Sequence, residues 1–240
     1  VTAIYPEYLT DPAIIFCPSD PVEKPDDAYS ELGIPHANPL YDVLPGGMAI
    51  HVPCTSAVQG QALIDSSYVY LGWVLDLADY KHETITLDYS GLRVVGPRQA
   101  VEALLPKAAP WFLNIVTLRD EENIDKDAET STSDFGNGGI GVSGLARPNG
   151  PRTIYRLREG IERFMITDIN NPAASAQAQS TVWIMGDSIS TEVQHYNHVP
   201  GGSNFLYLDG HVSFLRYEAQ GDAPVNAPLA QFVQSVMGEY

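Results

Sequence analysis

The stretch Asn204-Phe-Leu-Tyr-Leu-Asp-Gly-His-Val-Ser-Phe-Leu-Arg-Tyr217 carries the clearest fold signal in the sequence. Two runs of alternating apolar residues flank Asp209-Gly210, a dipeptide that tolerates the positive φ angles of a type I′ turn. If Leu208 pairs with His211, one face of the ribbon becomes apolar. That face would consist of Phe205, Tyr207, Val212 and Phe214. The sequence therefore predicts an antiparallel hairpin with this face packed on the core.

Other strands are predicted upstream of the hairpin. Residues 67–76 are dense in β-branched and aromatic residues, which is typical of a buried strand. Residues 84–88 favour a second strand, with a short helical turn as the alternative, and 181–185 favours a third.

Helices and loops are predicted from periodicity and composition. Apolar residues at helical spacing predict helices over 97–109 and 153–165, and a short closing helix is expected over 229–237. An acidic and then glycine-rich run predicts a long surface loop over 119–139. The proline-rich residues 1–60 are expected to form an irregular segment that wraps over a core built from 61–240.

Length and charge limit the classes of function. The chain of 240 residues suits one globular domain, and we expect a single head over 1–240. Its net charge of -17 repels phosphate backbones, so nucleic acid is a poor candidate partner. The same charge serves solubility and is compatible with divalent cations as counter-ions.

Searches for enzyme signatures find no G-x-S-x-G elbow, no H-E-x-x-H pair and no phosphate-binding loop. His195 and His198 precede Pro200-Gly201-Gly202, which favours a hydrogen-bonded turn over a metal site. A calcium site is the candidate with oxygen ligands. Its ligands would be Asp168, Asn170 and Asp187, or alternatively the acidic run Asp120, Glu121, Glu122, Asp125 and Asp127, which can also be merely solvated.

The two cysteines are Cys17 and Cys54. They do not form a CxxC motif, which disfavours zinc ribbons, thioredoxin-like sites and c-type haem attachment. Two interpretations stay open: a disulfide that closes a long loop, or two buried free thiols.

Three segments together resemble a known family. They are residues 153–175, residues 197–212, and residues 5–12 followed by Phe16-Cys-Pro-Ser-Asp20. All three are similar to the C-terminal heads of bacterial prepilin-type proteins, a pseudopilin-like and type IV pilin-like group whose tail carries a His, a spacer and Asp-Gly. Here His198 and Asp209 are separated by 10 residues, a spacer longer than usual for that group. The family's N-terminal leader and apolar helix are not among these residues, so the resemblance concerns the head.

The resemblance implies an α+β head with an antiparallel β-sheet, short helices and long loops. It implies an extracellular or cell-surface location, periplasmic before assembly, and a non-catalytic structural role in a pilus, a pseudopilus or a type II secretion assembly. The chain would self-associate into a filament or homo-oligomer and meet the membrane only through the missing helix. Loops 20–40 and 119–139 would present subunit contacts. The resemblance also favours a calcium ion or a disulfide in the head.

Two alternatives come from other classes of function. A surface module that binds carbohydrate or protein could use aromatic side chains such as Trp73, Trp111 and Trp183 as stacking platforms. A secreted hydrolase would need a histidine within hydrogen-bond reach of a serine or cysteine.

Overall fold

The structure is a computed structural model that describes residues 14, 16–20, 67–89, 91–107, 125–131, 135–137, 152–161, 179–198 and 200–237. Within these ranges it combines antiparallel sheets with short helices, which confirms an α+β fold. None of the described helices is long and apolar enough to cross a membrane.

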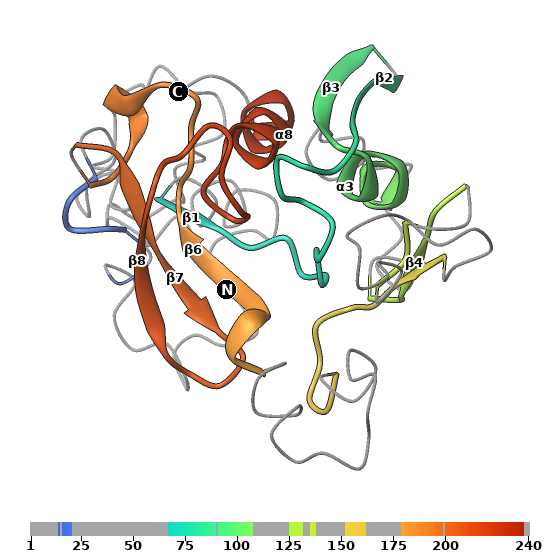
Figure 1. The fold of residues 1–240 in the computed structure, drawn as a ribbon, viewed down its shortest axis with the longest axis horizontal. Coiled ribbons are helices and arrows are strands. Elements are labelled where there is room, and N and C mark those ends of the chain that lie inside the picture. Colours follow the sequence, from blue (N-terminus) through green and yellow to red (C-terminus); the bar gives the residue numbers. More distant parts are fainter. Residues whose placement is uncertain are drawn as a thin grey trace, which may run out of the picture.

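The main sheet has four antiparallel strands in the order β1-β6-β7-β8 (Figure 1). They are β1 (Tyr68–Val69), β6 (Trp183–Asp187), β7 (Gly202–Tyr207) and β8 (Val212–Arg216). The predicted strands over 67–76 and 181–185 are thus present with other bounds. In the rest of the predicted 67–76 strand, only Trp73 forms a strand pairing, an isolated bridge to Arg156.

A hairpin and two helices form the next part of the fold. β2 (Thr84–Tyr89) and β3 (Leu92–Pro97) pair, and α3 (Arg98–Ala103) follows β3 directly. The C-terminal α8 (Ala227–Met237) lies between this hairpin and the main sheet in Figure 1. The predictions of a strand over 84–88 and of helices over 97–109 and 229–237 are therefore confirmed within the described residues.

The core is continuous across these elements because each contributes apolar side chains to one cluster. On α3, Val101 and the following Leu104 and Leu105 are fully buried, as their predicted helical spacing requires. Helix α8 contributes Leu229 and Phe232, and the main sheet contributes Phe205.

The predicted helix over 153–165 is wrong in its described part. The chain instead forms β5 (Thr153–Ile154), which pairs with β4 (Ala128–Glu129), and Arg156 then bridges to Trp73. Backbone groups of residues 152–157 hydrogen-bond to neighbouring segments, so they do not form an i to i−4 ladder. Residues 162–165 lie outside the described residues.

The segment over 119–139 is more ordered than a surface loop where it is described. It contains β4, and Asn137 is buried, with 3% of its surface exposed. The Asn137 amide donates to the Val74 carbonyl at 2.8 Å and accepts from the Tyr155 backbone at 2.6 Å. Polar composition alone could not predict this burial, because the hydrogen bonds that make it possible are tertiary.

The terminal hairpin turns at Asp209-Gly210 as predicted, but through three loop residues. The Tyr207 carbonyl accepts from Gly210 N at 2.9 Å, and Tyr207 N donates to the His211 carbonyl at 3.0 Å. Gly210 has a φ of 88°, so the loop combines a tight turn with a left-handed glycine. The predicted type I′ turn, with Leu208 paired to His211, is therefore wrong.

The extra loop residue shifts the strand register and divides the predicted apolar face between the two sides of the sheet. Val212 lies opposite Leu206, and Phe214 lies opposite Asn204. Phe205 is fully buried, whereas 61% of Val212 and 52% of Phe214 are exposed. A slip of one residue moves side chains to the other face of a sheet, which explains why half of the predicted core face lies outside.

His82, just before β2, gives the fold a testable pH dependence. Its side chain is 9% exposed, and neither ring nitrogen has a hydrogen-bond partner. Burial lowers the pKa of His82, an effect that the Asp79 carboxylate partly offsets. Because the unfolded chain then binds the proton better, this contribution to stability is present above about pH 6.5 and is lost below it.

We therefore expect the free energy of unfolding to fall as the pH drops below about 6.5, with a slope of at most about 1.4 kcal/mol per pH unit from this group. Urea denaturation at a series of pH values measures it. A His82→Gln variant should show a shallower slope than the parent, and equal slopes would contradict the assignment.

Candidate functional site

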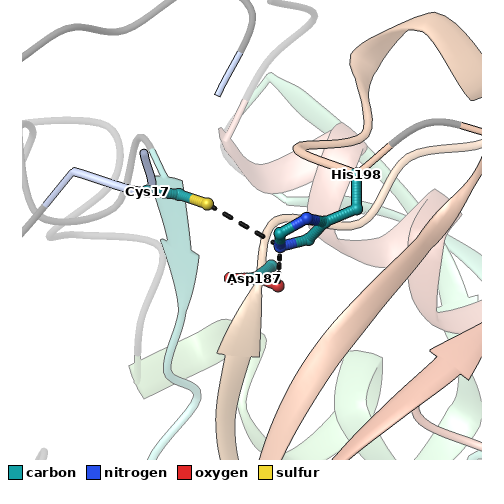
Figure 2. A group of neighbouring side chains, drawn as sticks. All are labelled: Cys17, Asp187 and His198. Carbon is teal, nitrogen blue, oxygen red and sulfur yellow. Dashed lines mark hydrogen bonds and ion pairs between the residues drawn. The ribbon is translucent and has the colours of Figure 1, made fainter. Parts of the chain in front are cut away.

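Cys17, Asp187 and His198 bring three different ligating atoms together (Figure 2). Nε2 of His198 lies 3.8 Å from Sγ of Cys17 and 2.9 Å from Oδ2 of Asp187. One ligating atom from each residue lies within 4.8 Å of the other two. In Figure 2 the cysteine sulfur points toward the imidazole, and the Asp187 carboxylate approaches the same ring nitrogen.

Each of the three side chains comes from a different segment. Cys17 begins a turn that is closed by a 2.9 Å bond from Asp20 N to the Cys17 carbonyl. Asp187 is the last residue of β6. His198 follows the 3-10 turn η4 (Val193–His195) and precedes β7. The site therefore exists only when the N-terminal turn docks against the C-terminal sheet.

Ser67 holds these segments together. Its hydroxyl donates to Oδ2 of Asp20 at 2.7 Å, and its carbonyl accepts from Ser188 N at 2.9 Å and from Nδ2 of Asn197 at 2.8 Å. Ser67, Asp20, Ser188 and Asn197 are all buried. Ser67, next to β1, thus holds in place residues that are close in sequence to Cys17, Asp187 and His198.

Asn204 positions the carboxylate from the adjacent strand. Its backbone N–H donates to Oδ2 of Asp187 at 2.8 Å, and its Nδ2 donates to the same oxygen at 2.9 Å. The same Nδ2 lies 2.9 Å from Nε2 of His198. Asp187 is 5% exposed and the His198 side chain 27% exposed, so the cluster is buried at the carboxylate and reaches solvent at the imidazole.

A single proton does not satisfy all of these contacts. If Nε2 of His198 carries a proton, it donates to Asp187, but it then faces the donor Nδ2 of Asn204 at 2.9 Å. If Nε2 is unprotonated, it accepts from Asn204, but its lone pair then faces the carboxylate. Flipping the Asn204 amide would set its oxygen against Oδ2 of Asp187. A cation bound between Nε2 and Oδ2 would remove the repulsion between the lone pair and the carboxylate.

The chemistry of the thiol disfavours a nucleophilic role. Burial raises the pKa of Cys17, and the Asp187 and Asp20 carboxylates raise it further, against the lowering effect of hydrogen bonds from Ser19 and Asn197. Catalytic cysteines need the opposite shift. A catalytic relay also uses the two ring nitrogens of histidine for different partners, whereas Cys17 and Asp187 both approach Nε2 of His198. The arrangement suits a ligand set better than a relay.

The structure places only part of the predicted site. Asp187 belongs to the cluster, whereas Asp168 and Asn170 lie outside the described residues. Of the alternative acidic run, Asp125 and Asp127 are described, and they pair with arginines of the 152–161 segment. Cys17 is a buried free cysteine, and Cys54 lies outside the described residues.

The two histidines of the predicted turn, His195 and His198, have different surroundings. His195 ends η4 with its side chain near Gln194, as expected of a hydrogen-bonded turn, whereas His198 enters the cluster. His198 and Asp209 lie at opposite ends of β7, so the spacer motif does not bring its two polar residues together. Sequence reasoning missed Cys17 with His198, because 181 positions along the chain separate them.

Comparison with models of protein families, with curated proteins and with solved structures finds no match for this chain.

Proposed function

We propose that this chain is the head of a non-catalytic structural subunit, pilin-like or pseudopilin-like, that self-associates outside the cell into a filament or a homo-oligomer. The observation that carries the proposal is the exposed apolar edge formed by β8. The resemblance of residues 153–175, of residues 197–212 and of residues 5–12 with 16–20 to prepilin-type heads supports it.

Strand β8 is the last strand of the main sheet, and within the described residues it pairs only with β7. Its free edge leaves backbone donors and acceptors available to another chain. Val212 and Phe214 project to solvent beside this edge. Soluble monomers usually protect such an edge with proline, a bulge or several charges. Here Val212–Arg216 contains a single charged residue, Arg216.

Charge also favours contact at this strand. Copies of a chain with net charge -17 repel one another, and any stable contact must form where that repulsion is weakest. Val212–Arg216 has no acidic residue, and Arg216 at its end is positive and exposed. A second copy can therefore approach β8 without placing like negative charges face to face.

We expect the purified chain to form concentration-dependent oligomers, and a Val212→Thr/Phe214→Thr variant to lose most of this association because its outer β8 face is no longer apolar. Threonine keeps the β propensity of the strand, so the variant should fold. Sedimentation velocity over a range of concentrations measures the oligomers, and negative-stain microscopy shows whether they are filaments.

Tyr80→Ser is the matched control, because Tyr80 is also exposed, at 48%, but lies outside the main sheet. This variant should associate like the parent. Added salt should strengthen association by screening the repulsion between copies. A chain that stays monomeric at high concentration and high salt would contradict the proposal.

A further inference from the structure

We infer that Cys17, Asp187 and His198 form a binding site for a transition-metal ion of the Zn²⁺ class, to which the described residues contribute these three ligands. This inference does not depend on self-association, because it is carried by the grouping of these three side chains and is tested by metal binding.

The donor set selects the class of ion. A thiolate sulfur and an imidazole nitrogen are ligands that Zn²⁺ prefers, and a carboxylate oxygen is a third that it accepts. Ca²⁺ binds oxygen atoms and takes six to eight of them. With Cys17 and His198 beside it, Asp187 stands in a mixed set of sulfur, nitrogen and oxygen that suits Zn²⁺ or Co²⁺.

The distances fit a common centre. Zinc–ligand bonds of about 2.0–2.3 Å at tetrahedral angles separate neighbouring ligand atoms by roughly 3.3–3.6 Å. The Sγ to Nε2 distance of 3.8 Å and the Nε2 to Oδ2 distance of 2.9 Å lie on either side of that range. Small side-chain rotations at Cys17 and His198 would place all three atoms around one ion.

A cation also resolves the electrostatic conflict in the cluster. With the ion in place, the lone pair of His198 Nε2 and the Asp187 carboxylate both face positive charge. Cys17 can then lose its proton, since a metal-bound thiol ionises readily. The same three groups without a cation leave a lone pair against a carboxylate or a proton against an amide donor.

The surroundings resemble the hydrogen-bonded support that metal ligands usually have. Asn204 orients Asp187 through two bonds to one oxygen. Ser67 links the Cys17 turn, through Asp20, to the end of β6 and to Asn197 beside His198. Such outer partners fix ligand orientation, and their loss typically weakens metal affinity by about 10–100-fold.

Bound metal would tie the N-terminal turn to the C-terminal sheet. Cys17 is the ligand from the turn, and the other two come from the ends of β6 and of the loop before β7. Binding to the folded chain but not to the unfolded chain would raise thermal stability as metal is added. The bound ion would thus cross-link the N-terminal turn to the C-terminal sheet, in place of a disulfide at Cys17.

The test is metal titration of the full chain after removal of metal with a chelator. We expect one Zn²⁺ per chain by competition with a chromogenic chelator. In the unmodified chain, Co²⁺ should give a tetrahedral absorption spectrum with a thiolate-to-metal charge-transfer band. Cys17→Ser should abolish that band, and Cys17→Ser or His198→Gln should weaken Zn²⁺ binding by more than the roughly 100-fold typical of an outer partner.

Three further variants make the result specific. His211→Gln is the matched control, because His211 forms a comparable pair with Asp209, at 2.5 Å, on the exposed turn. It should bind Zn²⁺ like the parent. Cys54→Ser should keep the thiolate-to-cobalt band, because Cys17 is the inferred thiolate ligand. Asn204→Ala should bind about 10–100-fold more weakly.

The inference is overturned if the unmodified chain binds no stoichiometric Zn²⁺ or Co²⁺, or binds only Ca²⁺. It is also overturned if the cobalt spectrum lacks a thiolate band, or if Cys17→Ser binds as tightly as the parent. The cobalt spectrum of the unmodified chain needs no substitution, so it decides the matter even where a variant fails to fold.

Discussion

Replacing Phe205 with alanine should lower the free energy of unfolding by about 3–5 kcal/mol, the usual cost of truncating a fully buried phenylalanine. Its ring is inaccessible to solvent and packs edge-on against Trp183, with ring centres 5.7 Å apart. It also covers Gly186, where a Cβ atom would lie 2.6 Å from the ring. The cavity left by Phe205→Ala would therefore open between β6 and β7. Urea denaturation followed by circular dichroism measures the loss.

Phe214 provides the matched control on the same hairpin. It is 52% exposed and contacts the His198 ring edge-on, with centres 6.2 Å apart. We expect Phe214→Ala to cost about 1 kcal/mol or less, because half of the ring already meets water. The two-residue turn expected from the sequence would bury Phe205 and Phe214 alike. Equal losses for the two variants would therefore contradict the observed register.

Asn137→Ala should lower the free energy of unfolding by about 2–4 kcal/mol, because it removes the hydrogen bonds of a buried amide to two backbone groups, and a buried group left unsatisfied costs roughly 1–3 kcal/mol. The groups are the Tyr155 N–H and the Val74 carbonyl. Asn137 also donates to Oδ1 of Asp76 at 2.8 Å, the oxygen that accepts from Gln99 of α3 at the same distance. Thermal and urea denaturation both measure the change.

Ser131→Ala tests whether the loss belongs to the buried network or to the acidic segment in general. Ser131 donates to Oε2 of Glu102 at 3.0 Å in an exposed bond. Its replacement should change stability by no more than about 0.5 kcal/mol. Similar effects of Ser131→Ala and Asn137→Ala would mean that Asn137 is not a structural anchor.

Several secondary-structure elements could be predicted from patterns within a few neighbouring residues. The helix at the C-terminus and the turn at Asp209-Gly210 were predicted correctly, since apolar spacing and turn chemistry are encoded within a few residues. The helix predicted over 153–165 does not form in the described residues, because the backbone of this segment pairs with residues outside it. Leu157 and Ile161 still pack together in a small apolar cluster, but from turns instead of a helix face.

The register of the terminal hairpin depends on a difference of one residue in the length of its loop. The sequence allows either a two-residue or a three-residue loop around Asp209-Gly210, and each places a different set of side chains inward. In the structure the longer loop places Val212 opposite Leu206, so Phe205 is buried against Trp183 while Val212 and Phe214 are exposed. The exposed apolar edge on which the proposed self-association rests is a consequence of that choice.

By itself, the sequence determined the position of the turn at Asp209-Gly210 and of the C-terminal helix, because periodicity and turn residues act over short distances. The α+β class was implied by the family resemblance, and Asp187 was predicted as a calcium ligand. Only the tertiary structure decided which groups Asp187 meets. Cys17 and His198 reach it because the 16–20 turn, the end of β6 and the loop before β7 share hydrogen bonds with Ser67. Ligand sets of this kind depend on contacts between distant segments, and no local pattern encodes those contacts.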